Sequence, residues 1–191
     1  MTNNIYKQIG ASNHTDKERA ELDYYATEPA AAQLLEDLIP LHKNLWECAA
    51  GGKHLSQVFE ANGHTVRNTD IIDRTGDIEE LDFLSTNEKW DGDIITNPPY
   101  NLSTEFCEKA IETVTEGNYV CMFLKIQFLE GKKHRKLFDK YPPKFVYVST
   151  KRLNCAANGD FEKYKYNSAV AFAWYVWEKG YKGDTILKWF N

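Results

Sequence analysis

The chain has 191 residues, a net charge of −5 and a mean hydropathy of −0.56. This length suits one domain with a sizeable core, and the composition is that of an ordinary soluble globular protein. The longest apolar stretch, SAVAFAWYVW at 168–177, is about half as long as a helix that spans a bilayer. The amino terminus lacks the basic and apolar blocks of a secretory signal. We therefore expect no membrane contact and a cytoplasmic location.

Predicted strands and helices alternate over the first 125 residues. Residues 1–22 are polar and lack periodicity, so we expect a flexible arm before a single domain at 23–191. The elements then follow in this order: a helix at 28–38, a strand at 44–49, a glycine turn with a helix ending at Asn62-Gly63, a strand at 64–71, a strand at 91–97, a helix at 104–114 and a strand at 118–125. The first helix has a proline near its start and several leucines on one face.

The last third of the chain continues with strands and a basic segment. In order, 132–141 is partly helical, 144–149 is a strand, 154–167 is a long loop and 168–178 is a strand. Strands that alternate with helices predict an α/β fold with a mostly parallel central sheet and flanking helices. Because no clear helical pattern separates the later strands, we expect the sheet to finish with an antiparallel carboxyl-terminal strand.

The spacing of the four cysteines does not predict a metal site. Cys48, Cys107, Cys121 and Cys155 lie far apart and show no paired spacing of metal ligands. We expect free thiols in a reducing compartment and no metal site.

The charges are unevenly distributed. Residues 1–120 carry 9 Lys and Arg against 22 Asp and Glu, whereas residues 121–191 carry 14 against 6. The acidic total argues against a surface covered with nucleic-acid-binding charge, but a local basic face would suffice to contact phosphates. The alternative is that these lysines are only solvated.

The first glycine turn, ECAAGGKHL at 47–55, follows a predicted strand. Ligands of open α/β sheets bind at the carboxyl ends of the strands, where small residues let backbone approach a ligand. Asp70 ends the next strand, about 20 residues after Glu47, a spacing that suits a carboxylate bound to ribose hydroxyls. No phosphate-binding glycine frame is present in the turn, and Glu47 would repel a pyrophosphate but attract an amino-bearing nucleoside. S-adenosylmethionine has this chemistry.

A second candidate contact for the nucleoside lies in LDFL, at 81–84. The carboxylate of Asp82 could accept from the adenine amino group, and the ring of Phe83 could lie on the adenine face. Core packing is an equally good interpretation of Phe83.

The tetrapeptide Asn97-Pro98-Pro99-Tyr100 follows the strand at 91–97. The Asn97 amide oxygen and the Pro98 carbonyl are two acceptors, and neither proline can donate a hydrogen bond. Because Pro99 forces Pro98 to be extended, the direction of that carbonyl is fixed. Two such acceptors can hold both hydrogens of a planar amino group and aim its lone pair at a methyl sulfonium carbon. Tyr100 can stack on a base drawn out of its duplex. The alternative is a purely structural turn.

The order of these motifs carries a resemblance. The chain contains, in sequence, ATEPAAAQLL, WECAAGGKHLS, TDIIDR, LDFL and DIITNPPYN. From about residue 24 onward it resembles class I S-adenosylmethionine-dependent DNA adenine-N6 methyltransferases of the NPPY type, in particular small phage and prophage members. The resemblance implies a Rossmann-like class I methyltransferase fold, S-adenosylmethionine as cofactor, and a bacterial or phage-infected host cell.

The resemblance also implies a role for each matched residue. Asn97, Pro98, Pro99 and Tyr100 are expected to be catalytic. The residues expected to bind the cofactor are Tyr25, Thr27, Pro29, Glu47, Ala49, Gly51, Asp70, Asp82 and Phe83. One position departs from the family pattern, because Lys53 stands where a second glycine is common. Lys53 either binds the cofactor carboxylate or points outward, and Gly52 could take over the role of the glycine.

We expect the basic part of the chain to recognise the target, because a chain of this length is too short to include a separate recognition domain of substantial size. The residues expected to contact double-stranded DNA are Lys132, Lys133, Arg135, Lys136, Lys151 and Arg152, with Lys163 and Lys165 in the loop that follows. Phosphate contacts would position the protein and one or two side chains would read bases. We expect a short target sequence and a monomer or weak homodimer.

Three alternative functions are compatible with these motifs. RNA adenine methyltransferases and methyltransferases of the glutamine amide in release factors share the tetrapeptide, although the latter resemble chains with a preceding helical domain. A catalytically silent module that binds the cofactor or DNA is the third alternative, and the intact tetrapeptide argues against it.

Overall fold

The computed structural model describes residues 24–157, 159, 161 and 170–190. The predicted arm at 1–22, and Lys163 and Lys165, lie outside the described residues.

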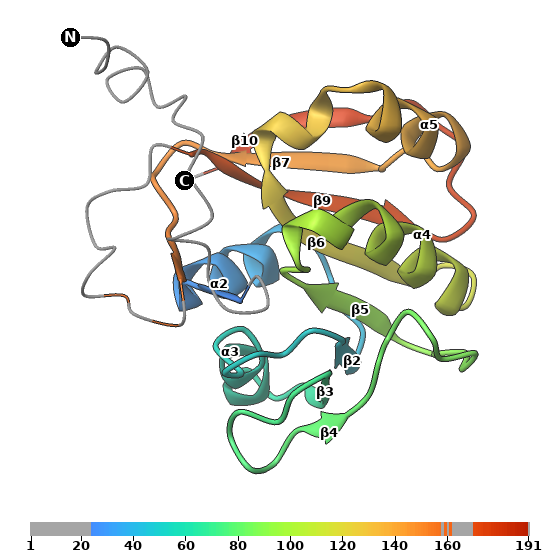
Figure 1. Cartoon of the computed structure of the whole chain (residues 1–191). Helices are drawn as coiled ribbons and strands as arrows, with labels where there is room; N and C mark the ends of the chain where they lie inside the picture. Colours follow the sequence, from blue (N-terminus) through green and yellow to red (C-terminus); the bar gives the residue numbers. More distant parts are fainter. Residues whose placement is uncertain (1–23, 158, 160, 162–169, 191) are drawn as a thin grey trace, which may run out of the picture.

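A central sheet organises the described part of the chain (Figure 1). Its eight described strands lie in this order: β10 (Ile186–Phe190), β7 (Phe145–Ser149), β9 (Phe172–Glu178), β6 (Tyr119–Lys125), β5 (Asp93–Thr96), β2 (Asn44–Glu47), β3 (Thr65–Asp70) and β4 (Glu79–Glu80). Every neighbouring pair is parallel except those of β9, which runs antiparallel to both β6 and β7. The predicted mostly parallel sheet is therefore confirmed; its antiparallel strand is β9, and the carboxyl-terminal strand β10 runs parallel to β7. The edge strands β4 and β10 were not among the predicted elements.

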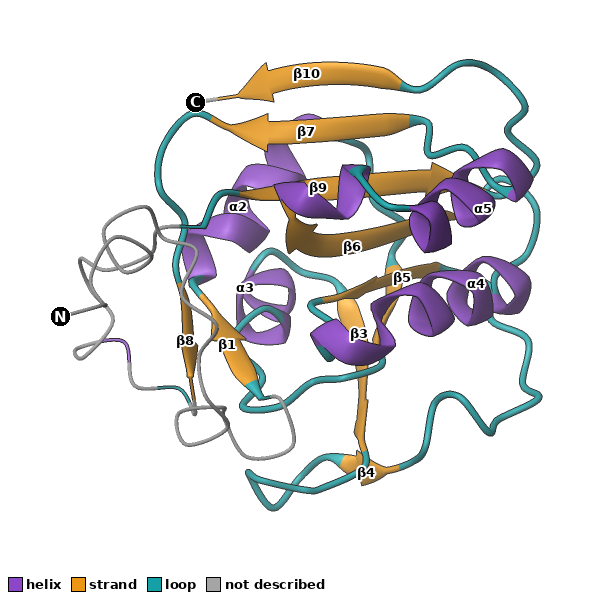
Figure 2. Cartoon of the chain, turned by 45° about the horizontal axis from the view of Figure 1, so that its top comes forward, coloured by secondary structure: helices purple, strands orange, loops and turns teal. Residues whose placement is uncertain are grey.

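Helices cover both faces of the sheet. The helices α4 (Ser103–Thr113) and α5 (Lys132–Lys140) pack on one face, and α2 (Pro29–Leu38) and α3 (Ser56–Ala61) on the other (Figure 2). Side chains alternate between the two cores, so that Ile94 faces α4 and Ile95 faces α2 and α3. A strand buried on both faces has a nearly continuous apolar sequence, as β6 has from Val120 to Leu124.

A small second sheet lies beside α2 and α3 (Figure 2). It consists of β1 (Tyr25–Thr27) and β8 (Cys155–Ala157), which pair antiparallel with Thr27 opposite Cys155. The expectation of an unbroken loop at 154–167 is wrong at its start, because residues 155–157 form β8. A segment of three residues is too short to show the alternating hydrophobic pattern of a strand. β8 can therefore be recognised only by its pairing with β1.

The order in which the chain adds strands to the sheet reverses between the parallel neighbours β2 and β5. The chain passes from β2 to β3 and β4 on one side and then from β5 to β6 on the other. In open α/β sheets, ligands bind in the crevice at the carboxyl ends of the strands at such a switch point. No helix in the described part of the chain is long and apolar enough to cross a membrane.

Candidate functional site

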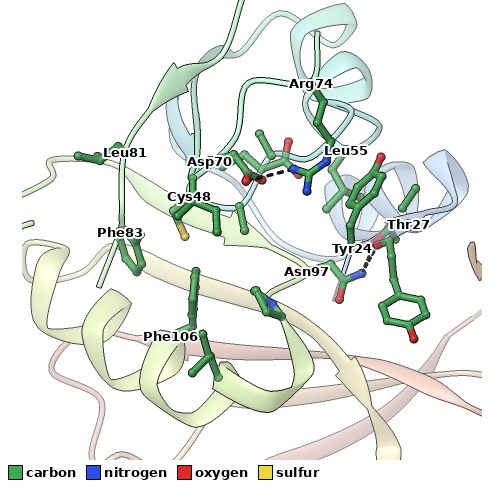
Figure 3. Close-up of a pocket in the computed structure, with 18 of the residues that line it drawn as sticks. Tyr24, Thr27, Cys48, Leu55, Asp70, Arg74, Leu81, Phe83, Asn97 and Phe106 are labelled. Atoms are coloured by element: carbon green, nitrogen blue, oxygen red, sulfur yellow. Dashed lines mark hydrogen bonds and ion pairs between the residues drawn. The ribbon is translucent and has the colours of Figure 1, made fainter. Parts of the chain in front are cut away.

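A cavity of about 290 Å³ lies at the carboxyl ends of β2, β3 and β5, with β1 on one side (Figure 3). Nine of the residues predicted for cofactor binding or catalysis line it: Tyr25, Thr27, Glu47, Ala49, Asp70, Asp82, Phe83, Asn97 and Pro99. The structure thus brings together residues from five separate segments of the sequence.

Four predicted residues do not line the cavity. Pro29 begins α2, and Gly51 supports the cavity from the turn behind it. Pro98 lies between the two lining residues Asn97 and Pro99. Tyr100 begins the short 3-10 helix η2 (Tyr100–Leu102), and its ring packs against neighbouring aromatic side chains.

The glycine turn requires glycine for two reasons. Gly51 has a φ of +55°, in the left-handed region that side chains disfavour. A Cβ at this position would also lie 2.3 Å from the ring of Tyr24. The turn is fixed to β3 because the Gly51 amide donates to Asp70 Oδ2 at 2.9 Å and the Ala50 amide donates to the Thr69 carbonyl at 3.0 Å.

Lys53 forms an ion pair outside the cavity, which favours the second of the two interpretations of this residue. Its ammonium lies 2.9 Å from Asp77 Oδ2, and Lys53 does not line the cavity. Its φ is +62°, so the backbone keeps the left-handed conformation that a glycine would adopt there. Lys53 therefore occupies a backbone conformation that favours glycine.

Glu47 is a buried carboxyl group at the floor of the cavity, with 4% of its surface exposed. Its Oε2 accepts hydrogen bonds from the Ser56 amide at 3.0 Å and from the Ser56 hydroxyl. Burial raises the pKa of Glu47 to about 8, and the two bonds from Ser56 oppose this only in part. A cation bound in the cavity would favour the charged carboxylate.

Asp70 holds an arginine that the sequence analysis missed. The Arg74 guanidinium donates to Asp70 Oδ1 at 3.2 Å, and the Ile72 amide donates to the same oxygen at 3.2 Å (Figure 3). The guanidinium carbon lies 4.6 Å from the centroid of the Tyr24 ring. A basic residue four positions after the strand-end aspartate was the available signal for this contact.

The opposite end of the cavity is apolar and aromatic (Figure 3). Phe83 is 1% exposed and packs edge-on against Trp46 at 5.3 Å and against Phe106 at 5.4 Å, measured between ring centroids. It also lines the cavity, so both interpretations of Phe83 hold. The neighbouring Asp82 is exposed, and its Oδ1 accepts from the Leu84 amide at 3.0 Å.

The Asn97 side chain lies between the cavity and β1. Its Nδ2 donates to the Tyr25 carbonyl and to Thr27 Oγ1, both at 2.9 Å, and lies 3.7 Å from the Cys155 sulfur. A carbonyl can only accept, so these contacts determine which end of the amide is nitrogen. The other end, Oδ1, is buried and has no hydrogen-bond partner among the described residues. Buried acceptors are nearly always satisfied in folded proteins, so this one indicates a place for a bound donor.

Aromatic and sulfur groups surround the Asn97 amide. The Tyr100 ring stacks on the Tyr25 ring with centroids 5.1 Å apart and planes inclined by 30°. The Lys125 ammonium lies 4.2 Å from the Tyr100 ring centroid. Burial raises the pKa of the Tyr100 hydroxyl well above its ordinary value and that of the Cys155 thiol to about 12. Both groups are therefore protonated near neutral pH.

His54 is a further cavity residue that the sequence analysis missed. Its Nδ1 is buried without a hydrogen-bond partner in the described part of the structure, and its ring contacts Phe161 edge-on at 5.3 Å. Burial lowers the pKa of His54, so the neutral imidazole is favoured. His54 belongs to no recognisable sequence motif. The turn that precedes α3 places it at the cavity, and this could not be predicted from the sequence.

No family model and no curated protein sequence matches the chain, but solved structures do. One, from Listeria monocytogenes, is assigned to the class I S-adenosylmethionine-dependent methyltransferases. It has a TM-score of 0.64 and 13% identity over 91% of this chain and 68% of that one. The fold is that of class I methyltransferases.

Two further structures with this fold carry different assignments. A Pyrococcus horikoshii protein assigned as an RNA methyltransferase has a TM-score of 0.62 and 16% identity, over 94% of this chain and 99% of that chain. The methyltransferase subunit of a type I restriction-modification system from Streptococcus thermophilus has a TM-score of 0.62 and 10% identity over 87% of this chain. The present chain spans 47% of that subunit. The class I methyltransferase fold therefore leaves the substrate open.

The predicted DNA-binding residues occupy two places in this methyltransferase fold. Lys132, Lys133, Arg135 and Lys136 are exposed on α5. Two of them form ion pairs, Lys133 with Glu105 at 2.8 Å and Arg135 with Asp139 at 2.6 Å. Lys151 and Arg152 are exposed just after β7, at the edge of the sheet that holds the cavity, and they precede β8.

Proposed function

We propose that the protein transfers a methyl group from S-adenosylmethionine to the N6 amino group of adenine in DNA. The observation that carries this proposal is the buried Oδ1 of Asn97, which has no hydrogen-bond partner among the described residues and belongs to a cavity lined by carboxyl and aromatic side chains. An exocyclic amino group is a planar donor that satisfies such an acceptor. Methyltransferases of other substrates share the fold, so the tetrapeptide and this oxygen carry the proposal, not the fold.

The donor set of the cavity fits S-adenosylmethionine. Three carboxyl groups and several aromatic rings line it, an arrangement that suits an amino-bearing nucleoside and disfavours a polyphosphate. Glu47 would hold the amino group of the methionine part, Asp70 the ribose hydroxyls, and Asp82 with Phe83 the adenine. Ala49 and Gly51 form the turn beneath it, and Tyr25, Thr27 and Pro29 lie at the methionine end. When bound there, the cofactor supplies an electrophilic methyl group on its sulfonium.

The tetrapeptide prepares the nucleophile. Asn97 Oδ1 and the Pro98 carbonyl would accept the two hydrogens of the adenine amino group, and the lone pair of its nitrogen would then point at the methyl carbon. The nitrogen–carbon bond forms as the carbon–sulfur bond breaks, and the proton leaves the nitrogen afterwards. No strong base is required. Pro99, by fixing the extended conformation of Pro98, keeps the second acceptor in place.

Tyr100 remains the proposed stacking partner of the flipped base. In the structure one face of its ring is covered by Tyr25 at 5.1 Å. The proposal therefore requires the Tyr25 ring to move aside when the base enters, or to form part of the stack.

Contacts to DNA are proposed for the exposed basic residues. Lys151 and Arg152 lie between β7 and β8, and Lys132, Lys133, Arg135 and Lys136 lie on α5. The similarity to a restriction-modification methyltransferase subunit is consistent with this choice. RNA is the second candidate, because the protein assigned as an RNA methyltransferase matches almost end to end.

Radiolabelled S-adenosylmethionine distinguishes these substrates when the protein is incubated with unmethylated duplex DNA, duplex RNA and release factor. We expect label in the N6 position of DNA adenine. Label only in RNA or in protein contradicts the proposal, and cofactor binding without any transfer identifies a silent module.

Asn97→Ala tests the residue that carries the proposal. This variant should abolish transfer and bind the cofactor with nearly the affinity of the wild type, measured by calorimetry. Asn62→Ala, at an exposed asparagine after α3, is the matched control and should leave both unchanged. Loss of cofactor binding in Asn97→Ala would assign Asn97 to the cofactor site instead.

A further inference from the structure

We propose that Thr27 is a positioning residue for the Asn97 amide, an inference that rests on the proposed function of Asn97. The Thr27 hydroxyl accepts a hydrogen bond from Asn97 Nδ2 at 2.9 Å, equal in length to the bond that the Tyr25 carbonyl accepts. The resemblance assigns Thr27 to the cofactor. The geometry assigns its hydroxyl to the catalytic side chain.

The two bonds have different effects on the amide. The Tyr25 carbonyl can only accept, so it determines that nitrogen and not oxygen faces β1. The Thr27 hydroxyl holds the second amide hydrogen and thereby fixes the rotation of the amide plane. With both hydrogens bound, the free lone pairs of Oδ1 keep one direction. A rotating amide would present its acceptor to the target amino group only part of the time.

The Thr27 hydroxyl is itself held firmly. Thr27 is 3% exposed and lies in β1, opposite Cys155 of β8. The next residue joins the same two segments, because the Glu28 amide donates to the Asn154 carbonyl at 3.0 Å and Glu28 Oε2 accepts from the Asn154 amide at 3.1 Å. The Cys155 sulfur is a third, weaker acceptor of the same Nδ2, at 3.7 Å. A buried hydroxyl on a paired strand is a rigid acceptor.

Thr27→Val removes the hydroxyl with little change in shape, and Thr27→Ser restores it. We expect Thr27→Val to lower kcat about tenfold or more, because one buried amide hydrogen loses its acceptor. The cofactor dissociation constant should change less than about twofold. Thr27→Ser should recover most of kcat. The matched control is Thr86→Val, a mostly buried threonine outside the cavity whose hydroxyl accepts from the Glu88 amide at 3.2 Å.

A second measurement does not depend on activity. In ¹⁵N-labelled protein, the side-chain amide resonances of Asn97, assigned by their loss in Asn97→Ala, report the Thr27 bond directly. They should shift in Thr27→Val and stay near the wild-type position in Thr27→Ser and Thr86→Val. Thr27→Ala replaces Thr27→Val in both measurements if the valine variant does not fold.

Several results would overturn the inference. These are unshifted Asn97 resonances in Thr27→Val, a kcat within about twofold of the wild type, or a loss that appears mainly as weaker cofactor binding. If the wild type labels no adenine, the proposed function fails, and the resonances alone then decide whether Thr27 holds the Asn97 amide.

Discussion

The backbone amide of Gly51 donates a 2.9 Å hydrogen bond to Oδ2 of Asp70. The glycine turn after β2 and the carboxylate at the end of β3 are therefore one unit, although 19 residues separate them. Arg74 binds the second oxygen of the same carboxylate. A substitution in the turn should consequently shift the Asp70 carboxylate at the proposed ribose site.

Gly51→Ala should disturb both the fold and the cofactor site. A left-handed alanine costs about 1–2 kcal/mol, and its Cβ would lie 2.3 Å from the Tyr24 ring, which must move. We expect a free energy of unfolding lowered by at least that amount in urea denaturation, and a cofactor affinity at least tenfold weaker.

Gly63→Ala separates the cost of the left-handed backbone from the cost of the clash with Tyr24. Gly63 has a φ of +95° with open space around it, so it shows the backbone cost without a steric clash. Equal losses in the two variants would mean that the contact with Tyr24 has no effect. Tyr24→Ala combined with Gly51→Ala should recover the part that is due to the clash.

Stability should depend on pH through Glu47. The carboxyl has a pKa of about 8 in the folded protein against an ordinary value of 4.5. Between these values the folded state binds more protons than the unfolded state, so stability falls as pH rises. In Glu47→Gln this part of the pH dependence should disappear. Urea titrations at pH 5, 6, 7 and 8 check this, and identical slopes in the two proteins would contradict the raised pKa.

Cofactor binding should show the opposite dependence on pH. An ammonium group beside Glu47 favours the carboxylate, so binding below about pH 8 releases a proton. The affinity for S-adenosylmethionine should therefore increase from pH 6 to 8, by no more than about tenfold per pH unit. Calorimetry in buffers of different ionisation enthalpy measures the released proton. No proton release would place the amino group away from Glu47.

Lys53 should be replaceable by glycine with little effect. Glycine adopts a φ of +62° without strain, and the exposed ion pair with Asp77 that is lost contributes about 0–1 kcal/mol. We expect Lys53→Gly to stay within about 1 kcal/mol of the wild type, whereas Lys53→Val should destabilise by more because a β-branched side chain disfavours this backbone. Cofactor affinity should not change in Lys53→Gly. A large loss of affinity would mean that the ammonium reaches the cofactor.

Binding to DNA should depend on Lys151 and Arg152. If both contact phosphates, the double alanine variant should weaken binding and reduce the slope of log K against log salt by about 0.9 for each lost contact. Lys140→Ala is the control, because Lys140 ends α5 beside Glu112, near the far end of α4 from Asn97. Filter binding at several salt concentrations measures the slope. An unchanged slope in the double variant would exclude this edge from the DNA interface.

The fold could be predicted wherever an element carries its own signal. The buried strands β6 and β9 are apolar over most of their length, and α2 has a proline at its start. The short strands β1, β4 and β8 carry no such signal, because two or three residues show no period. They exist only through the strand with which each one pairs.

The candidate site divides in the same way. Asn97, Glu47 and Asp70 stand in motifs and could be predicted to meet at the strand ends. Tyr24, His54 and Arg74 reach the cavity through packing of the turns, so the sequence analysis missed them. The bond between Thr27 and Asn97 was also missed, because a resemblance transfers roles between residues but not the contacts of one particular chain.

The pairing of β1 with β8 has a consequence for how the protein folds. Thr27 and Cys155 lie far apart in the sequence, so bringing them together costs the loop-closure entropy of most of the described chain. The central sheet can gain its apolar burial before that loop closes. We therefore expect the Asn97 amide to take its orientation only after the central sheet has formed, so that a formed sheet alone does not complete the site.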